Sequence, residues 1–298
     1  MSKYLIINAD GYGLTAGINR AVEECIQLGT VSSISANVNG RYAEDLSPLA
    51  AKHPRLSVGC HLNPVVGRPV LPPDMVRSLV DKEGCFWGKK FDVKLLTGHI
   101  KLPELKQELL AQVNLCRDLA GSLTHLDAHM AKHRLPRYYP VFLDIAKAHG
   151  IGRIRTHRYK TVCFDGRTGI SPFRFFFRRP VGLIKGLWNS WLRLRAKRSG
   201  LAMPDRGLFP VDSTGSVSRS IDAWLSLLTH VPNGFNEFWV HPAYVDKDLP
   251  AISGYVKGRE EERQILTDER FRNNLYRSEV ILASYHDIPV KRNENYDS

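Results

Sequence analysis

The sequence lacks the cysteine patterns that mark disulfide-rich proteins and thiolate metal sites. Its five cysteines are widely scattered, odd in number and without a CxxC pair; they are Cys25, Cys60, Cys85, Cys116 and Cys163. This spacing argues against a disulfide framework and against a zinc site built from cysteines. We expect reduced, mostly buried thiols.

Long apolar runs and nucleotide-binding signatures are also missing. No window approaches the ~20 apolar residues of a membrane-spanning helix, and the N-terminal MSKYLIINAD lacks the parts of a secretory signal. We therefore expect a cytoplasmic protein. GxGxxG does not follow the first apolar run and GxxxxGK[ST] is absent, so neither signature favours an open nucleotide-binding sheet.

What the 298 residues do contain is a regular alternation of short apolar runs and amphipathic segments. The expected strands are residues 4–10, 31–38, 56–62, 123–129, 152–157, 235–244 and 279–285. The expected helices begin after Thr15 and near residues 43, 103, 137 and 258. Strands that alternate with helices of this length predict βαβ units and a parallel sheet. We predict an α/β fold, an irregular (β/α) barrel forming a single domain over residues 1–298.

Polar side chains follow several of these strands. They are Asn8 and Asp10 after the first strand, His61 after the third, His125, Asp127 and His129 along the fourth, Arg155 after the fifth, and His241 near the end. In a parallel α/β barrel the carboxyl ends of the strands meet at one rim, where catalytic groups lie. The sequence therefore predicts one site assembled from at least four strands.

Each residue also has a structural explanation. Asp10 precedes a helix and is a candidate cap, and a single histidine such as His61 is more often a buried hydrogen-bonded residue than a ligand. The H-x-D-x-H pattern at 125–129 is different, because period-2 alternation places its three polar side chains on one strand face. Imidazole and carboxylate groups are ligands of zinc and other divalent ions. We therefore expect a metal site.

Five motifs in order resemble those of the YdjC-like carbohydrate deacetylases. They are NADGYGLTAGIN at 8–19, GCHLNP at 59–64, HLDAHMAKHRLP at 125–136, RIRTHR at 153–158 and VHPAYVD at 240–246. That family shows NADDFG, GxHxN, HxDSHxHxH, a strand with an arginine, and an HP element. The resemblance covers residues 1 to about 160 and 218–287, including an RxxE-type helix before EVILASY.

This resemblance implies a polysaccharide-deacetylase type of barrel and a metal-dependent hydrolase that removes an N-acetyl group from an amino sugar, oligosaccharide or glycolipid. It implies Asp10 as catalytic base, His61 and His129 as ligands of Mg²⁺ or Zn²⁺, His241 as the proton donor to the leaving amine, and Arg155 as an orienting residue. We expect the remaining polar residues of the motifs to contact the substrate; they are Asn8, His125, Asp127, His133 and Tyr244.

One position departs from the family. The second aspartate of NADDFG, a metal ligand, corresponds to Gly11, and Ala131 stands where another histidine is usual. Three arrangements are open. Asp10 is the third ligand, with Asp127 or a second water accepting the proton; this is the one we favour. A substrate group or His133 completes the shell. Alternatively, the metal is lost and the chain is a non-catalytic carbohydrate- or membrane-binding relative.

The net charge of +12 is concentrated in one segment. Residues 153–208 hold fourteen basic side chains and two acidic ones. The difference between these two numbers equals the net charge of the whole chain. Within 160–215, expected as an insertion, the apolar residues that follow Pro180 have helical spacing, which predicts a basic amphipathic helix. Packing on the barrel as a lid is our preferred interpretation. Peripheral contact with an anionic membrane, which would suit a lipid-linked sugar, is the alternative.

Two further expectations concern partners. No recognised nucleic-acid-reading motif accompanies the basic segment, so we do not expect DNA or RNA as a partner. The family resemblance suggests a homodimer, although nothing in the sequence itself fixes the oligomeric state.

Overall fold

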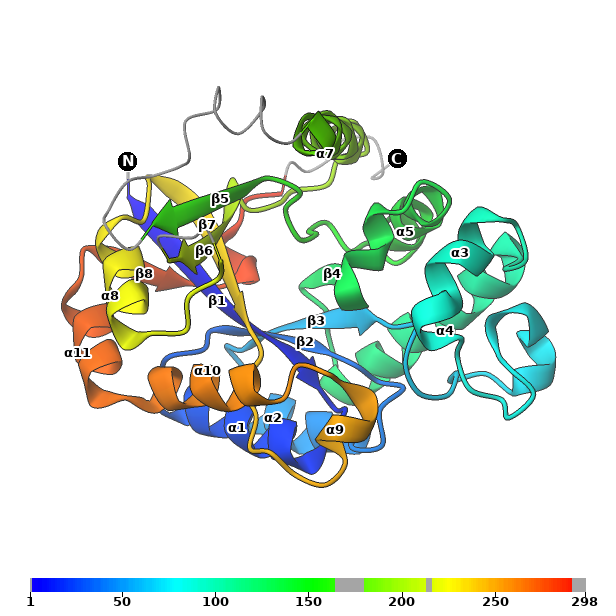
Figure 1. The fold of residues 1–298 in the computed structure, drawn as a ribbon, viewed down its shortest axis with the longest axis horizontal. Coiled ribbons are helices and arrows are strands. Elements are labelled where there is room, and N and C mark those ends of the chain that lie inside the picture. Colours follow the sequence, from blue (N-terminus) through cyan, green and yellow to red (C-terminus); the bar gives the residue numbers. More distant parts are fainter. Residues whose placement is uncertain (1, 164–179, 213–215, 291–298) are drawn as a thin grey trace, which may run out of the picture.

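The structure of the protein is a computed structural model that describes residues 2–163, 180–212 and 216–290. One parallel sheet runs through it (Figure 1). Its strands are β1 (Lys3–Tyr12), β2 (Ser33–Ala36), β3 (Ser57–Leu62), β4 (His125–Ala128), β5 (Tyr159–Cys163), β6 (Arg206–Val211), β7 (Gly234–Val240) and β8 (Val280–Ala283). The order along the sheet is β4-β3-β2-β1-β7-β6-β5, and β8 also pairs with β1.

β1 lies at the centre of the sheet and has neighbours along both edges. β7 pairs with residues 3–9 on one edge. On the other edge β8 pairs with residues 3–6 and β2 with residues 8–12. The β1–β2 register shifts between Asp10 and Tyr12, where Gly11 has φ +102°. A backbone with this positive φ favours glycine, so the irregularity lies beside the first residue of the expected site.

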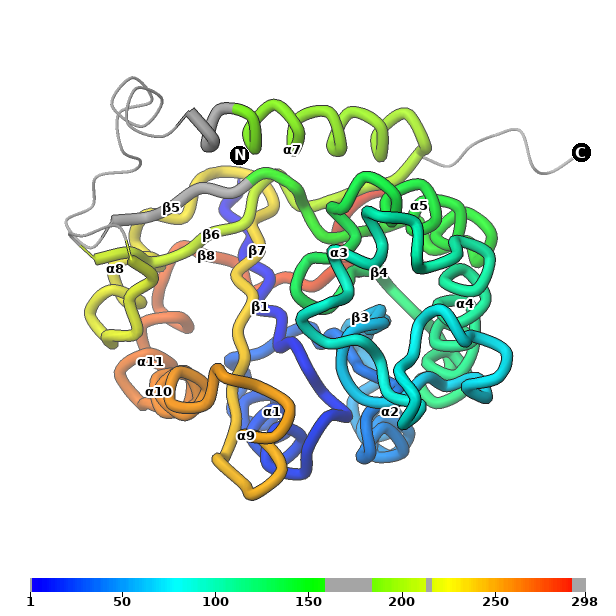
Figure 2. The backbone as a smooth tube through the Cα atoms, turned by 45° about the vertical axis from the view of Figure 1, so that its right-hand side comes forward, coloured from blue at the N-terminus to red at the C-terminus, as the bar shows by residue number. Residues whose placement is uncertain are grey.

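Helices surround the strands (Figure 2). They are α1 (Ala16–Gln27), α2 (Leu46–Lys52), α3 (Phe91–Leu96), α4 (Leu102–Ala120), α5 (Tyr138–Ala148), α7 (Pro180–Arg198), α8 (Ile221–Thr229), α9 (Leu249–Ile252), α10 (Lys257–Thr267) and α11 (Glu269–Arg277). Short 3₁₀ helices lie between them: η1 (Ala43–Asp45), η2 (Pro73–Met75), η3 (Arg77–Leu79), η4 (Gly88–Lys90), η5 (His129–Arg134) and η6 (Tyr285–Asp287). Among the described helices, none is both long enough and apolar enough to cross a membrane.

The sheet curls so that its two ends approach each other without pairing along a ladder. Single parallel bridges join Leu126 of β4 to Ile154, and Arg153 to Ala202. The predicted α/β fold in a single domain is thereby confirmed, and the predicted irregular (β/α) barrel is a curled half-barrel. The segment 152–157, expected as a strand, makes only these bridges, and it carries Arg155 into the middle of the curve.

Most predicted elements are confirmed within a few residues, and their local causes are visible. The Thr15 side chain caps α1 by accepting a hydrogen bond from the backbone amide of Ile18. α4 opens with proline in its first turn and is followed by Gly121 at φ +75°. Apolar side chains from the strands and from the inner faces of the helices form one large buried core.

Two expectations about elements need correction. The charged helix expected over 258–275 is two helices, because Asp268 has extended backbone and its side chain caps α11 by accepting from the Arg270 amide. The segment 160–215 is not simply added to the barrel, since β5 and β6 on either side of α7 belong to the main sheet. Its aromatic stretch at 175–177 lies outside the described residues.

Candidate functional site

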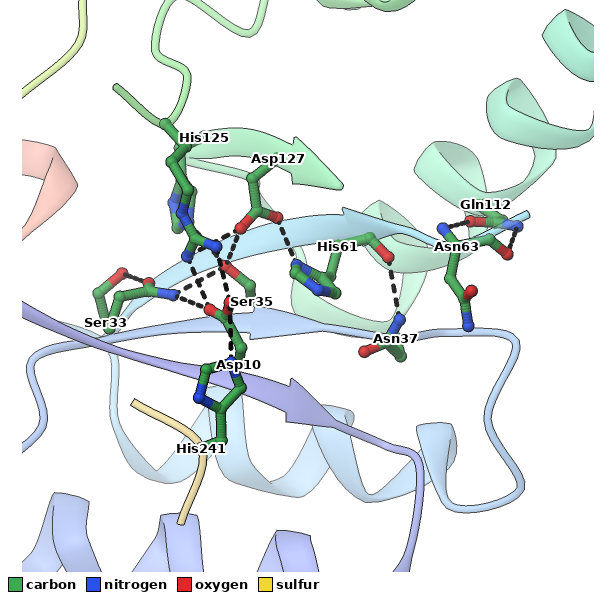
Figure 3. Close-up of polar contacts among 12 residues, drawn as sticks. Asp10, Ser33, Ser35, Asn37, His61, Asn63, Gln112, His125, Asp127 and His241 are labelled. Carbon is green, nitrogen blue, oxygen red and sulfur yellow. Dashed lines mark hydrogen bonds and ion pairs between the residues drawn. The ribbon is translucent and has the colours of Figure 1, made fainter. Parts of the chain in front are cut away.

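The expected rim residues meet where β1, β3 and β4 end (Figure 3). Asp10 lies on β1, His61 on β3 and Asp127 on β4, and ligand atoms of these three side chains all lie within 4.8 Å of one another. All three are buried. Because parallel strands deliver their carboxyl ends to the same edge, residues 51 and 117 positions after Asp10 reach one point.

Arg155 is the hub of this cluster. Its Nη1 and Nη2 donate to Asp10 Oδ2 and Oδ1 at 2.6 and 2.7 Å, a bidentate pair. Its Nη2 also lies 2.9 Å from Asp127 Oδ2, and its Nε donates to Glu237 Oε1 on β7 at 2.8 Å. Desolvation, the largest single influence, would raise the pKa of Asp10 and of Asp127, but Arg155 and His61 together outweigh it and hold both pKa values below their usual range. Both carboxylates are therefore ionised.

A layer of hydroxyl and amide groups fixes these carboxylates from behind. Asn8 Nδ2 donates to Asp10 Oδ1 at 2.7 Å and to Ser35 Oγ at 2.9 Å. Ser35 Oγ in turn donates to Asp127 Oδ2 at 3.0 Å, and Ser33 Oγ donates to Asn8 Oδ1 at 2.6 Å. All five side chains are buried and hydrogen-bonded, so the two carboxylates have little freedom to move.

His61 and His129 provide two imidazoles near Asp10. His61 Nδ1 is hydrogen-bonded to Asp127 Oδ1 at 2.8 Å, an arrangement that fixes the ring and leaves Nε2 for a ligand. The His129 ring is 5.5 Å from that of His61, centroid to centroid, in an edge-on orientation. Burial, together with the neighbouring His61 and Arg259, lowers the pKa of His129 to about 3, so its imidazole is neutral as metal binding requires.

These donors fit a divalent cation. Two imidazoles and one carboxylate are a common ligand set for zinc and other first-row metals. Asp10 Oδ2 keeps a second lone pair beyond its bond to Arg155, whereas Oδ1 accepts from both Arg155 and Asn8. The ligand atoms that lie close enough together to hold an ion come from Asp10, His61 and Asp127. The His129 ring lies beside that of His61, and Asp127 is hydrogen-bonded to His61 Nδ1.

His241 faces Asp10 from the segment after β7. Its Nε2 lies 3.9 Å from Asp10 Oδ2, and its Nδ1 lies 3.6 Å from Glu262 Oε2 of α10. Glu262 also accepts from the His241 backbone amide at 2.5 Å and from the hydroxyl of Tyr255. The His241 imidazole is therefore held between the carboxylates of Asp10 and Glu262. It is 30% exposed and still reaches solvent.

Several expected substrate contacts lie elsewhere. Asn8, His125 and Asp127 are fully buried, which leaves them no surface for a substrate and gives them a supporting position. His125 stacks on Tyr285 at 3.6 Å. His133 is buried behind the cluster against Phe142 and His157, and its two ring nitrogens have no partner among the described residues. It does not complete the shell around Asp10.

Tyr244 is separate from the cluster. Its hydroxyl donates to Glu24 at 2.8 Å, and the guanidinium groups of Arg20 and Arg263 lie over its ring at 4.3 and 4.2 Å. This places the Tyr244 side chain between α1 and α10 instead of beside Asp10. The HP element therefore brings His241 to the site and directs Tyr244 to the outside.

Sequence reasoning missed Glu237, Ser33 and Ser35, and it included Arg259 and Glu262 only as the RxxE of a helix, without a place in the site. A signal exists for some of them: Ser33 and Ser35 alternate along an interior strand, and Glu237 interrupts the apolar run FNEFWV. Polar residues on fully buried strands need partners, which marks them as parts of a network. Nothing in the sequence alone indicates that Arg259 lies beside Gly11.

Comparisons with known proteins identify the family of this chain. The family described as YdjC-like protein matches residues 4–277. A carbohydrate deacetylase from Thermoanaerobacter pseudethanolicus is 28% identical over 95% of this chain and 98% of its own. A chitooligosaccharide deacetylase from Yersinia enterocolitica is 30% identical over 96% of this chain and 100% of its own.

A solved structure from Enterococcus faecalis, described as a candidate cellobiose-phosphate cleavage protein, has the same fold. It superposes with a TM-score of 0.74 at 25% identity and covers 96% of this chain and 98% of its own.

Proposed function

The chain belongs to the YdjC-like family, and on that premise we propose that it is a hydrolase that removes the acetyl group from the nitrogen of an amino sugar. The observation that carries the proposal is the meeting of Asp10, His61 and Asp127 at one sheet edge, with His129 beside His61 and His241 beside Asp10. In our proposal Mg²⁺ or Zn²⁺ would be held by His61, His129 and Asp10, with Asp127 orienting His61. When bound, such an ion supplies Lewis acidity for the acetamide carbonyl and for water.

Asp10 suits the role of ligand better than that of base. Both of its oxygens accept from Arg155, and its pKa lies below the usual range, so it is a weak proton acceptor. Asp127 is also unsuited, because it is fully buried and its oxygens face His61, Arg155 and Ser35. The proton of the attacking water must go to another group.

His241 is the group that remains. In our proposal its Nε2 takes the proton from water as the carbonyl carbon is attacked, and the same nitrogen returns the proton to the departing amine. Glu262 fixes the ring from the Nδ1 side, and Asp10 at 3.9 Å stabilises the transient imidazolium. One histidine that acts as base and then as acid follows the logic of serine hydrolases.

Acetate release tests this function. The substrates are N-acetylglucosamine and its short oligomers, and the variants are His241→Gln and the exposed control His286→Gln. We expect acetate from the wild type, a fall in kcat of roughly 10²–10⁴-fold for His241→Gln, and no change for His286→Gln. Wild-type activity in His241→Gln would refute the proposed proton transfer by His241.

A non-catalytic sugar-binding protein is the second candidate. Gly11 in place of a carboxylate and the engagement of Asp10 by Arg155 favour it. This candidate requires that calorimetry detects binding of the same oligomers while no acetate is formed.

We also propose that α7 contacts an anionic membrane surface. Ile184, Leu187, Trp191 and Leu194 follow helical spacing on one face and are 67, 64, 44 and 47% exposed. The other side of the helix packs on the protein: Leu192 and Ala196 are fully buried. An apolar stripe that remains exposed although the helix is docked is the pattern of an interfacial helix.

The charges beside this stripe match an anionic surface. Lys185, Arg195, Lys197 and Arg198 are exposed, and the helix contains no acidic residue. The helix is anchored through Trp188, whose Nε1 donates to the Arg134 carbonyl at 2.9 Å. Arg134 closes η5, which begins with His129. A membrane contact at α7 would thus present the site to sugars attached to lipids.

Vesicle co-sedimentation tests this contact. Vesicles with 30% phosphatidylserine and vesicles of phosphatidylcholine alone are compared for the wild type, Leu187→Ser/Trp191→Ser and the control Val93→Ser/Leu96→Ser on α3, whose residues are similarly exposed at 64 and 50%. We expect binding to the anionic vesicles by the wild type and the control only. Equal, negligible binding by all three would leave α7 as a lid.

The remaining expectations about partners and place stay predictions. We propose a lipid-linked or free amino sugar as substrate, a cytoplasmic location at the membrane periphery, a homodimer and no nucleic-acid partner. Light scattering on the purified chain measures the oligomeric state directly.

A further inference from the structure

A second buried arginine, Arg259 of α10, lies beside the site but has a very different environment from Arg155. It is 4% exposed, and among the described residues no carboxylate forms an ion pair with it. Its Nε has no hydrogen-bond partner, and its Nη1 makes one long contact of 3.5 Å with the His241 carbonyl. A buried guanidinium normally has several acceptors, so this one has capacity left for a ligand.

Gly11 explains why the partner is missing. A Cβ built at Gly11 would lie 3.6 and 3.9 Å from Nη1 and Nη2 of Arg259. A carboxylate side chain at this position would start within reach of the guanidinium, whereas glycine leaves the space between them without an acceptor. The absence of a side chain at Gly11 therefore accounts for the absence of a carboxylate partner for Arg259.

Arg259 also acts on the site electrostatically. Its charge contributes to lowering the pKa of His129, and Glu262 and, to a smaller extent, Asp10 counteract the lowering of the pKa of Arg259 by burial. Arg155, by contrast, has Asp10, Asp127 and Glu237 around it and offers no free capacity. The positive charge of this site that is available to a ligand is thus located at Arg259, next to Gly11.

We propose that Arg259 and the space over Gly11 form an oxyanion subsite that takes a carboxylate or phosphate group carried by the sugar substrate. The inference rests on the proposed function in that it makes the substrate an acidic amino sugar. The planar guanidinium suits both anions, since it donates two parallel hydrogen bonds to either. The net charge of +12 would favour the approach of such a substrate.

Thermal shift titrations test the subsite without turnover. The ligands are glucuronate, glucose 6-phosphate, glucose and acetate, none of which contains an acetamide. The proteins are the wild type, Arg259→Met, and Arg263→Met as a control on the same helix, where Arg263 is paired with Glu260. We expect glucuronate or glucose 6-phosphate to raise the Tm of the wild type and of Arg263→Met above the effects of glucose and acetate. The ligand that raises the Tm more shows whether the subsite prefers a carboxylate or a phosphate group.

The apparent affinity for that ligand should fall roughly tenfold or more in Arg259→Met, because a hydrogen-bonded charge pair is lost. Gly11→Asp keeps Arg259 and fills the space with a carboxylate; its backbone there has φ +102°, so its Tm without ligand is measured first. If it folds, it should abolish the anion effect as well.

Equal shifts with glucose, an effect of acetate as large as that of the acidic sugars, or undiminished binding by a folded Arg259→Met would overturn the proposal. Because no ligand here is hydrolysed, a failure to release acetate from N-acetyl sugars would refute the deacetylase function and leave the subsite standing.

Discussion

Two regions depart from the usual rule that charged side chains lie at the surface and apolar ones inside. The polar cluster around Arg155 buries charged groups, and the outer face of α7 exposes apolar ones. Around Arg155, three carboxylates and an arginine lie inside the protein, and their polar atoms are held by Asn8, Ser33 and Ser35. On α7, four large apolar side chains point to solvent. Buried charge and exposed apolar surface both cost stability unless something compensates for them.

The difference lies in where the compensation is found. In the cluster, it is internal, because hydrogen bonds and ion pairs satisfy almost every group. For α7, nothing in the described residues covers the apolar stripe, so the compensation must come from outside. Variants in the cluster should therefore change stability strongly, and variants on the outer face of α7 should change it little.

The largest effect is expected for Arg155→Met. This change leaves Asp10, Asp127 and Glu237 buried without their counter-charge, and breaking such a pair costs about 3–5 kcal/mol of unfolding free energy. Urea denaturation measures the loss, with the exposed Arg158→Met as control. Similar stabilities of the two variants would show that the cluster is not held together by Arg155.

Acidification should also weaken the buried region. Burial lowers the pKa of His125 and of His157 to about 3 in the folded protein, from 6.5. The unfolded chain then binds protons below pH 6.5 that the folded chain does not, so stability is present above that pH and is lost as the pH falls. Between pH 7 and pH 5 the loss is about 2 kcal/mol for each histidine.

Urea denaturation at both pH values checks this expectation. His157→Gln should reduce the loss on acidification by about 2 kcal/mol, while the exposed His99→Gln should leave it unchanged. A pH dependence that is the same in all three proteins would contradict the assignment to buried histidines.

A smaller effect is expected for Ser35→Ala. The hydroxyl of Ser35 donates to Asp127 and accepts from Asn8, and both partners stay buried when it is removed. The cost should be about 1–3 kcal/mol of unfolding free energy. Ser190→Ala on the exposed side of α7 is the control, with a change below about 0.5 kcal/mol.

The smallest effect on stability should come from Leu187→Ser, within about 0.5 kcal/mol, because this side chain is 64% exposed. Leu192→Ala, five residues further along the same helix and fully buried, should cost about 2 kcal/mol or more. If Leu187→Ser is as damaging as Leu192→Ala, the stripe on α7 packs against the protein and is not a docking surface.

Much of the fold followed from local pattern. Apolar runs, Thr15, Pro103 and the glycines after the helices predict the first half of the chain nearly element by element. The carboxyl-end rule then placed Asp10, His61 and Asp127 together, because it depends only on strand direction. The helix break at Asp268 was missed because Asp268 is an ordinary surface residue until its side chain caps the next helix.

What could not be predicted are contacts between distant parts of the chain. Glu237 meets Arg155 only because β7 pairs with β1, and Arg259 meets Gly11 across 248 positions. The same limit led us to expect substrate contacts from Asn8 and His125. Strand alternation gives the face on which a side chain lies, but burial on that face depends on which neighbours cover it.

The metal content of the purified protein tests the central claim most directly. After dialysis against zinc, manganese or magnesium, elemental analysis should find about one ion per wild-type chain for one of these metals. The His61→Ala/His129→Ala variant should retain less than a tenth of that amount, and the control His99→Ala/His286→Ala, with both residues exposed, should match the wild type. Equal metal content in all three proteins, or none in the wild type, would contradict a metal-dependent site at the ends of β1, β3 and β4.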